Sequence, residues 1–262
     1  MQSASATTTP ATHDASVRAQ YDARAAAYLS SAVHASGADL DRMAELVGTR
    51  PDAVALDMGC GGGHVAFRLA GLVGKVVAYD LSAPMLATVA AEADRRGLAN
   101  VVTKQGAAEA LPCPDASFDV VATRYSAHHW GDCARGLAQM RRTVKSGGLA
   151  LFMDVVSPGV ALLDTWLQTL ELLRDPSHVR NASLAEWRGL LAGAGFAVAD
   201  VQTYRLRLAF GPWIERMRTP EAHVAAIRAL QARAPGEVRD HFAIEDDGSF
   251  TVDTVLIAAR PA

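Results

Sequence analysis

The most informative segment of the chain is Val54-Ala-Leu-Asp-Met-Gly-Cys-Gly-Gly-Gly-His64. A short apolar run leads directly into four glycines within five positions, and the residues that follow are amphipathic at helical spacing. Glycine suits such a turn because its backbone adopts unusual dihedral angles and lets a ligand approach closely. The stretch therefore predicts a buried strand, a ligand-binding loop and the beginning of a helix. An ordinary tight turn is the alternative.

An acidic residue, Asp80, ends the next apolar run about twenty residues after the glycine loop, where a carboxylate can bind ribose hydroxyls. Dinucleotide-binding loops carry glycine at their first, third and sixth positions. Counted from Gly59, the third position is Gly61 but the sixth is His64, whose ring would obstruct close packing of helix on strand. Asp57, just before the first glycine, suits a cationic ligand better than a pyrophosphate. These residues favour an adenosyl-amino acid over a nicotinamide dinucleotide.

Apolar runs and helix-length amphipathic segments alternate along the chain, which predicts a parallel sheet covered on both faces. The segment from Ala15 to Val47 is helical in pattern, and the Gly147–Gly148 pair is expected to close a helix before the fifth strand. Strands are expected at Val54–Met58, Val76–Tyr79, Val101–Lys104, Phe118–Thr123, Leu149–Val156, Ala197–Leu208 and Phe250–Ala258. Helices are expected at His64–Leu72, Pro84–Arg96, Asp132–Lys145, Ala161–Leu173, Leu184–Leu191 and Pro220–Ala232.

Several short motifs carry a resemblance to a known family: Asp57-x-Gly59-x-Gly61, Asp80, Leu111-Pro112 and Ser117-Phe118-Asp119. With them the chain resembles the class I S-adenosylmethionine-dependent methyltransferases, in the ubiquinone/menaquinone-biosynthesis-like (type 11) branch. The resemblance extends from about Tyr21 to Arg260. It implies an α/β fold with a Rossmann-like, doubly wound, seven-stranded and mostly parallel sheet, an antiparallel last strand, helices on both faces and an N-terminal helical lid.

The expected organisation is a flexible N-terminal tail at residues 1–14 followed by a single domain at 15–262. Within that domain, residues 15–50 form the helical lid, 51–156 the cofactor-binding half and 157–262 the substrate-side half. The sequence contains no internal repeat and no linker long enough to divide domains.

The resemblance also implies a cofactor, S-adenosyl-L-methionine, with the glycine loop at its methionine end, Asp80 at the ribose and Leu81 at the adenine. Family members usually carry Gly-Asp-Ala after the third strand, and that Asp bonds the adenine amino group. This chain has Gly106-Ala107-Ala108 instead, so one hydrogen bond of about 1 kcal/mol is missing and weaker binding is expected. The expected cofactor-binding residues are Tyr28, His34, Asp57, Gly59, Cys60, Gly61, Asp80, Leu81, Met85, Ala107, Ala108 and Arg124.

Two polar segments, Arg124–Trp130 after the fourth expected strand and Leu173–Arg180 after an apolar helix, are candidates for the substrate site. The adjacent histidines of the first segment point in different directions, so no metal site is expected, but either could act as a base near neutral pH. The alternatives are one buried, hydrogen-bonded histidine and a surface salt bridge between Arg174 and Asp175. Paired arginines suit an anionic or carbonyl-bearing substrate. The expected catalytic residues are His129, His128 and His178, and the expected substrate residues are Tyr21, His129, Arg174, His178 and Arg180.

The composition indicates a globular protein that acts on small molecules. Half of its 262 residues are hydrophobic, the formal net charge is −3, and no long Lys/Arg block suggests nucleic acid or an anionic membrane as a partner. The longest apolar run, Leu149–Met153, is far too short to span a bilayer. The 3 cysteines are far apart and odd in number, which argues against a disulfide framework and a structural zinc site and favours a cytoplasmic location.

The expected activity is methyl transfer by in-line displacement to a small-molecule acceptor, with carbon or oxygen favoured over nitrogen. A sulfonium leaving group is already activated, so the protein mainly supplies positioning and desolvation. The alternatives are a nicotinamide-dependent oxidoreductase on the same kind of sheet and a non-catalytic S-adenosylmethionine-binding protein. The sequence does not indicate the oligomeric state or the identity of the acceptor.

Overall fold

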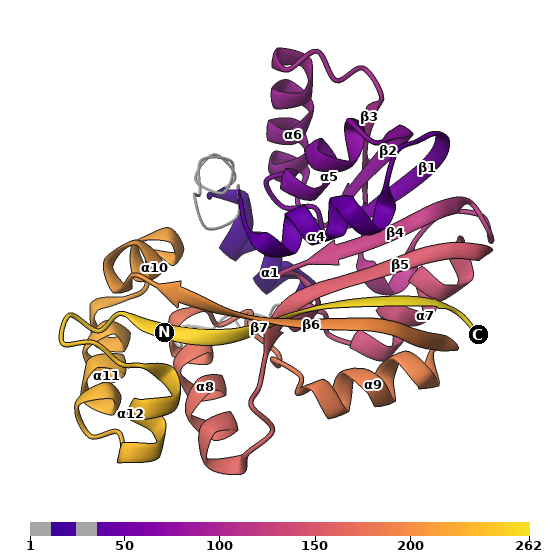
Figure 1. Ribbon diagram of the computed structural model, residues 1–262. Helices are drawn as coiled ribbons and strands as arrows, with labels where there is room; N and C mark the ends of the chain where they lie inside the picture. Colours follow the sequence, from indigo (N-terminus) through magenta and orange to yellow (C-terminus); the bar gives the residue numbers. More distant parts are fainter. Residues whose placement is uncertain (1–11, 25–35) are drawn as a thin grey trace, which may run out of the picture.

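The computed structural model describes residues 12–24 and 36–262, in which helices and strands alternate (Figure 1). The strands are β1 (Arg50–Met58), β2 (Val73–Asp80), β3 (Val101–Gln105), β4 (Phe118–Arg124), β5 (Val144–Val156), β6 (Phe196–Leu208) and β7 (Phe250–Pro261). The helices are α1 (His13–Asp22), α4 (Ala38–Val47), α5 (His64–Ala70), α6 (Ala83–Arg95), α7 (Cys133–Thr143), α8 (Ala161–Arg174), α9 (Leu184–Gly193), α10 (Phe210–Met217), α11 (Glu221–Ala232) and α12 (Gly236–Phe242). Two single-turn helices, η1 (Ala108–Ala110) and η2 (Ala127–His129), complete the set.

All seven strands form one sheet in the order β3-β2-β1-β4-β5-β7-β6. The strands from β3 to β5 pair in parallel, whereas β7 runs antiparallel to both β5 and β6. The prediction of a Rossmann-like, doubly wound sheet with an antiparallel last strand is therefore confirmed.

The register of the central strands brings their carboxyl ends together. Asp57 of β1 lies opposite Ala78 of β2 on one side and Ala122 of β4 on the other. Because these strands are parallel, the glycine loop after β1, Asp80 at the end of β2 and the turn after β4 all lie at the same sheet edge. Ligands bind at this edge in open α/β sheets.

Helices cover both faces of the sheet, as predicted. On one face α4, α5 and α6 pack against the strands through buried apolar side chains such as Met43, Leu69 and Val89. On the other face α7 and α9 do the same through side chains such as Leu137 and Trp187. Alternating burial on the two sides of near-continuous apolar strands is what the apolar runs in the sequence predict.

A third hydrophobic cluster lies where β6 and β7 extend beyond the rest of the sheet, and α8, α10, α11 and α12 gather around it (Figure 1). Its centre is aromatic: the rings of Trp166 and Phe242 are 4.5 Å apart, and those of Trp213 and Phe250 are 5.0 Å apart. This helical cap holds α8 and α10 beside the carboxyl edge of the sheet. The side chains at their ends thereby reach the neighbourhood of the glycine loop.

The N-terminal region differs from the expected tail and lid. Helix α1 begins at His13, because the Thr12 side chain caps it by accepting a hydrogen bond from the amide of Ala15, so residues 13 and 14 belong to a helix and not to a tail. Helix α4, expected in the lid at 15–50, instead packs in the core through Leu40 and Met43. Only α1, of the two described helices in this region, faces the ligand-binding edge.

The boundaries of other strands and helices also differ from those predicted from the sequence. Strand β5 begins at Val144, so Gly147 and Gly148 lie inside it and do not close a helix; the register jumps there from Phe118↔Val144 to Val120↔Leu149. A Cβ on Gly148 would lie 2.9 Å from the carbonyl oxygen of Asp119, so the irregular strand depends on glycine at this position. Helices α10 and α12 were not predicted. Within the described residues, no helix is both long and apolar enough to cross a membrane.

Candidate active site

The glycine loop is held tightly between the ends of β2 and β4. The amides of Gly59 and Cys60 both donate to the carbonyl oxygen of Tyr79, at 2.8 and 3.0 Å. Gly59 has a φ of 72°, and a Cβ at this position would lie 1.9 Å from Oγ of Ser126. Only glycine satisfies both the dihedral angle and the close approach.

Asp80 is fixed by the same loop. Its Oδ2 accepts from the amide of Gly61 at 2.8 Å, and its Oδ1 accepts from the amide of Ser82 at 2.9 Å. Burial raises the pKa of Asp80, and these two amide donors oppose the rise. The carboxylate thus lies between the glycine loop and the start of α6.

Asp57 lies beneath the loop and is 1% exposed. Its Oδ2 accepts from the amide of Ala66, in the first turn of α5, at 2.9 Å. Burial raises the pKa of Asp57 to about 7, with the Ala66 amide opposing and Asp80 adding to the rise. A buried carboxylate with such a pKa gains a favourable partner when a cation binds beside it.

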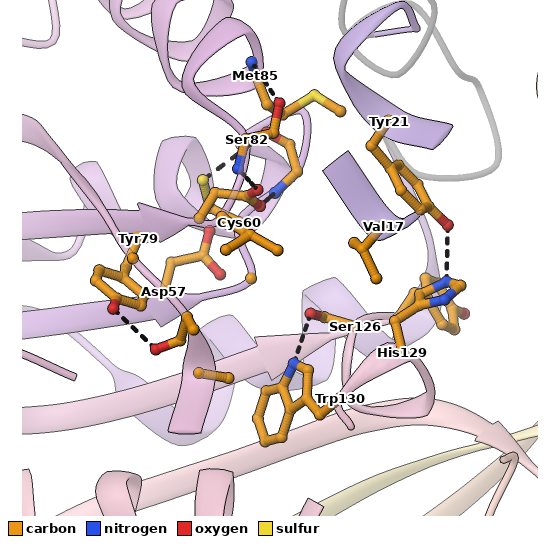
Figure 2. Close-up of a pocket in the computed structure, with 18 of the residues that line it drawn as sticks. Val17, Tyr21, Asp57, Cys60, Tyr79, Ser82, Met85, Ser126, His129 and Trp130 are labelled. Carbon is orange, nitrogen blue, oxygen red and sulfur yellow. Dashed lines mark hydrogen bonds between the residues drawn. The ribbon is translucent and has the colours of Figure 1, made fainter. Parts of the chain in front are cut away.

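These groups line one cavity of about 1060 Å³ at the carboxyl edge of the sheet. Figure 2 shows Asp57 and Cys60 across the cavity from Val17 and Tyr21 of α1, with Met85 also lining it. Helix α1 therefore lines the same cavity as the glycine loop.

The far end of the cavity is lined by Leu81, Ala107 and Ala108, the expected adenine end. The hydroxyl of Tyr79 donates to the carbonyl oxygen of Ala107 at 2.9 Å, and burial raises the pKa of Tyr79 to about 12. A Cβ on the preceding Gly106 would lie 2.0 Å from that hydroxyl. Ala107 itself presents no polar side-chain atom, as the sequence analysis noted.

Arg124, expected to contact the cofactor, lines the cavity, but its guanidinium is paired with the carboxylate of Asp39. Its Nε and Nη2 lie 2.5 and 3.1 Å from the two carboxylate oxygens of Asp39, and both side chains are buried. The bidentate pair joins the end of β4 to the first turn of α4. Arg124 thus fixes this wall of the cavity.

The most polar part of the cavity wall is built around His129. The Tyr21 hydroxyl lies 2.7 Å from Nε2 of His129 and 3.0 Å from Oδ2 of Asp175, and Nδ1 of His129 lies 3.1 Å from the carbonyl oxygen of Ser177. A carbonyl oxygen only accepts, so Nδ1 carries a proton. The Tyr21 hydroxyl has one hydrogen and can donate it either to Oδ2 of Asp175 or to Nε2 of His129, the contact drawn in Figure 2. Burial, with a further contribution from the neighbouring His128, holds the pKa of His129 well below 6.5.

Asp175 completes this network, although the sequence analysis treated it only as a partner of Arg174. Its Oδ1 accepts from both the amide and the hydroxyl of Ser177, at 2.9 and 2.6 Å. Burial would raise the pKa of Asp175, but His129 and the Ser177 donors outweigh it and the pKa is lowered. An Asp-Pro-Ser sequence, which favours such local turns, was the available signal.

The rings of His128 and His129 lie 4.2 Å apart, tilted by 51°, but His128 has a different hydrogen-bond partner. Its Nδ1 lies 2.5 Å from Oδ1 of Asp154. Burial opposes protonation, but the Asp154 carboxylate outweighs it, so the pKa of His128 is raised. His128 does not line the glycine-loop cavity but the two hollows beside it.

One of these hollows, the second cavity, shares Tyr21, Tyr125 and His129 with the glycine-loop cavity. Arg174, a predicted substrate residue, lines it: its Nε donates to the carbonyl oxygen of Trp213 at 3.0 Å. The alternative of an Arg174–Asp175 salt bridge is wrong, because the ion pair of Arg174 is with Glu171, one helical turn earlier, and Asp175 bonds Tyr21 and Ser177. Asn181 and Arg216 also line the second cavity and were missed by the sequence analysis.

The structure does not bring His178 or Arg180 to either of these cavities. Nε2 of His178 lies 2.8 Å from Oε1 of Gln168, and burial, with His128, lowers the pKa of His178 to about 3. Arg180 is exposed and paired with Asp164 and Glu186. The amides of residues 179 and 180 both donate to the carbonyl oxygen of His128, which turns this end of the segment away from the cavities.

Two predicted cofactor residues, Tyr28 and His34, lie outside the described residues. Among the residues that the structure does describe, no three His, Cys, Asp or Glu side chains are arranged to hold a metal ion.

A strand, a glycine loop and an acid after the next strand define a Rossmann-like nucleotide site, here with a covered cavity. Residues 56–152 match the model of a methyltransferase domain. The chain is 50% identical over 200 residues to the uncharacterized protein YafE of Escherichia coli, covering 76% of this chain and 97% of that protein. It is 34% identical over 235 residues to the uncharacterized methyltransferase YcgJ of Bacillus subtilis, covering 88% and 93%.

Comparison with solved structures leads to the same class of protein. The crystal structure of Bacillus subtilis YcgJ superimposes with a TM-score of 0.82 at 33% identity, covering 85% of this chain and 97% of that one. That of a putative methyltransferase from Bacillus halodurans gives 0.82 at 30% identity, covering 86% and 100%. The chain belongs to the class I S-adenosylmethionine-dependent methyltransferases, in the type 11 branch, as predicted. It is a methyltransferase with S-adenosyl-L-methionine as its cofactor, and not a nicotinamide-dependent oxidoreductase.

Proposed function

We propose that the chain methylates a small-molecule acceptor at oxygen or carbon, with His129 as the general base. The observation that carries this proposal is the position of His129 on the wall shared by the two cavities, with Nε2 2.7 Å from the hydroxyl of Tyr21, which also lines both. When bound, S-adenosylmethionine supplies a methyl group on a sulfonium whose leaving group is neutral. The protein then has to hold an acceptor in line and remove its proton.

The residues of the glycine-loop cavity fit this cofactor. The Asp80 carboxylate, already held by the Gly61 and Ser82 amides, would accept from the ribose hydroxyls. The buried Asp57, whose pKa burial raises, would be stabilised in its charged form by the ammonium of the methionine end. Leu81, Met85, Ala107 and Ala108 offer an apolar wall for the adenine.

The hydrogen bonds of His129 allow Nε2 to accept a proton from the methyl acceptor and stabilise the protonated ring. In its neutral form, Nδ1–H is bonded to Ser177 and Nε2 accepts from the Tyr21 hydroxyl. An acceptor group that displaces this hydroxyl can deliver its proton to Nε2. Once Nε2 carries a proton, the Tyr21 hydroxyl turns its own hydrogen to Oδ2 of Asp175, which lies 3.0 Å away. The nearby Asp175 carboxylate then stabilises the imidazolium.

The low pKa of His129 restricts the acceptor. A weak base removes protons efficiently only from acidic groups, because general-base catalysis follows the difference in pKa between the two partners. Phenols, enols and carbons between two carbonyl groups satisfy this condition, whereas aliphatic alcohols do not. We therefore infer an acidic oxygen or carbon as the methylated atom.

The proposal can be tested by following label from methyl-labelled S-adenosylmethionine in a cell extract separated into small molecules and macromolecules. We expect label in the small-molecule fraction, and a loss of about 100-fold or more in His129→Gln. His178→Gln is the matched control, because His178 lines neither of the two cavities and should leave the rate unchanged. Label in protein or nucleic acid, or full activity of His129→Gln, contradicts the proposal.

A further inference from the structure

The second cavity extends away from the wall on which His129 lies. It shares Tyr21, Tyr125 and His129 with the glycine-loop cavity and continues between α8, α10 and strand β6. An acceptor whose reacting atom is at His129 therefore has the rest of its structure in the second cavity. The charges of this cavity then restrict the part of the acceptor that does not react; this step rests on the proposed function.

A buried ion pair lies in the wall of the second cavity. Nη1 of Arg174 lies 3.4 Å from Oε2 of Glu171, one helical turn earlier in α8, and each residue is 8% exposed. The guanidinium is also held by α10, because its Nε donates to the carbonyl oxygen of Trp213 at 3.0 Å and its carbon lies 4.9 Å from the centre of the Trp213 ring. The charge of Arg174 is therefore already offset within the protein.

A second buried carboxylate, Asp175, lies beside this ion pair. It is 1% exposed, and its Oδ2 accepts from the hydroxyl of Tyr21, which lines the cavity. Burial opposes ionisation, but His129, the Ser177 donors and Arg174 together lower the pKa of Asp175. The carboxyl group is therefore ionised and adds a negative charge at this wall.

The charges around the second cavity leave no positive charge in excess. The guanidinium groups that line it are matched by one carboxylate on its wall and by one bonded to Tyr21, and the histidine that lines it is matched by its own carboxylate. The positive groups are Arg174, Arg216 and, when protonated, His128, and the negative groups are Glu171, Asp175 and Asp154. Residues 25–35, outside the described part, contain no Asp, Glu, Lys or Arg.

The side-chain amide of Asn181 adds an uncharged polar group to the same wall. Asn181 is 1% exposed, and its Nδ2 has no hydrogen-bond partner among the described residues. Its backbone is fixed on both sides, because its amide donates to Oε1 and its carbonyl accepts from Nε2 of Gln168. A buried N–H donor without a partner is unfavourable, and a carbonyl or hydroxyl oxygen of a ligand can satisfy it without bringing a charge.

We propose that the second cavity takes an uncharged part of the acceptor, and that Glu171 is the residue that determines this specificity. Glu171 occupies Arg174, whose guanidinium would otherwise suit a carboxylate of the ligand. An anion buried here would lose its hydration without gaining a counter-charge, and Glu171 and Asp175 would repel it. The acceptor thus has one acidic group, which reacts at His129, and is otherwise neutral. Of the anionic and carbonyl-bearing substrates that paired arginines suit, this cavity favours the carbonyl-bearing class.

Arg180 and Glu186 form a comparable ion pair outside the two cavities. Nη2 of Arg180 lies 2.8 Å from Oε1 of Glu186, and neither residue lines the glycine-loop cavity or the second cavity. Glu186 also closes a capping box with Ser183 at the start of α9, a role that glutamine can fill. Glu186→Gln therefore removes the same charge from the same kind of pair, which makes it the matched control for Glu171→Gln.

The test is calorimetric titration, near neutral pH, of the full chain loaded with S-adenosylhomocysteine, so that no turnover occurs. The probes are benzylamine and three pairs of an amide and its acid: benzamide and benzoate, 4-hydroxybenzamide and 4-hydroxybenzoate, and phenylacetamide and phenylacetate. We expect at least one amide to bind about tenfold or more tightly than its acid and than benzylamine. In Glu171→Gln the ratio should shift about tenfold or more toward the acid, because Arg174 has lost its partner. Glu186→Gln should keep the wild-type ratio.

The proposal is overturned if no amide binds at millimolar concentration, if an acid or benzylamine binds as tightly as the amides, or if Glu171→Gln keeps the wild-type ratio. An equal shift in Glu186→Gln also contradicts it. Thermal unfolding shows whether each variant is folded. The double variant Glu171→Gln/Arg174→Gln removes both charges, so it should retain the preference for the amide, and a preference for the acid there would contradict the charge balance.

Binding of S-adenosylhomocysteine and transfer dependent on His129 are measured separately. Their absence would contradict the proposed function, whereas their presence without a preference for the amide contradicts only this inference.

Discussion

The glycine-loop cavity and the second cavity share a wall, but one is lined largely by backbone and the other by side chains. The first is made largely of backbone at strand ends, where Gly59 approaches Ser126 and the Gly61 amide holds Asp80. The second is made of long side chains that come from α8 and α10 and from the segment after α8. At Gly59 the backbone leaves no room for an added carbon, whereas a site made of side chains changes by exchange of single charged groups. The cofactor side is thereby fixed and the acceptor side can be varied.

The largest expected effect is that of adding one carbon to the loop. In Gly59→Ala the Cβ would meet Oγ of Ser126 at 1.9 Å on a backbone with φ of 72°, so we expect a loss of about 3–5 kcal/mol in the free energy of unfolding. Gly61→Ala is the control, because its Cβ meets nothing within 4 Å and only the φ of 48° is strained, at about 1 kcal/mol. Urea unfolding measures both; equal losses would contradict the backbone account.

Asp57 provides a pH-dependent test of the same side. Burial raises its pKa from 3.8 to about 7 in the folded chain, so its contribution to stability is full below pH 4 and is lost as the pH rises to 7. Without ligand, we expect a decrease of about 2 kcal/mol between pH 5 and 7 that Asp57→Asn removes. Urea unfolding at both pH values measures it. A wild-type slope unchanged by Asp57→Asn would show that burial does not shift this carboxyl.

Binding of S-adenosylhomocysteine should change with pH in the opposite sense. The ammonium of this ligand stabilises the charged form of Asp57, so its affinity should increase as the pH rises from 5 to 7, by up to about tenfold per unit. Calorimetry across this range measures the slope, and Asp57→Asn should bind more weakly with no slope. An affinity independent of pH in the wild type would place the ammonium elsewhere.

The shared wall is tested through Tyr21. Removing its hydroxyl in Tyr21→Phe deletes the bonds to His129 and Asp175, and we expect about a tenfold lower rate of transfer. Because the pKa of His129 is low, the acid limb of the rate profile should lie below pH 6.5. Tyr204→Phe is the control, since the buried hydroxyl of Tyr204 has no partner among the described residues. An equal effect of the two substitutions would contradict the network.

The smallest expected effect is at the adenine end. Ala107→Asp would supply the carboxylate that family members usually carry there, and one hydrogen bond of about 1 kcal/mol should tighten S-adenosylhomocysteine binding about fivefold. Ala99→Asp, at an exposed position, controls for the added charge. Unchanged or weaker binding in Ala107→Asp would show that the adenine amino group is already satisfied by this chain.

The sequence predicted the cofactor side well because that side is local. Strand β1, the loop and Asp80 are each specified by neighbouring residues, and their spacing already brings them to one sheet edge. The start of β5 was predicted five residues late, because Gly147 and Gly148 suggest a turn unless the partner strand is known. Helix α10 was not predicted, because Gly211 and Pro212 in its first turn suggest a loop when only the sequence is considered.

The acceptor side was predicted only in part, because its residues meet through tertiary packing. His129 and Tyr21 were singled out correctly as neighbours of the cavity, but nothing local indicates that Asp175 bonds Tyr21, 154 positions earlier. Arg180 and Arg174 look alike in sequence and differ only in the direction that their segment takes after Pro176. Arg216 depends on the unpredicted helix α10.

The attachment of helix α1 is linked to the integrity of the network around His129. None of its residues is buried, and polar contacts attach it and the residues just after it: Nε2 of His13 lies 2.7 Å from the carbonyl oxygen of His129, the Tyr21 hydroxyl contacts both the His129 ring and Oδ2 of Asp175, and Arg24 donates to the carbonyl oxygen of Met217. Two of these four contacts are to His129 itself. Detaching α1 to exchange ligands thus also disassembles the network around the base.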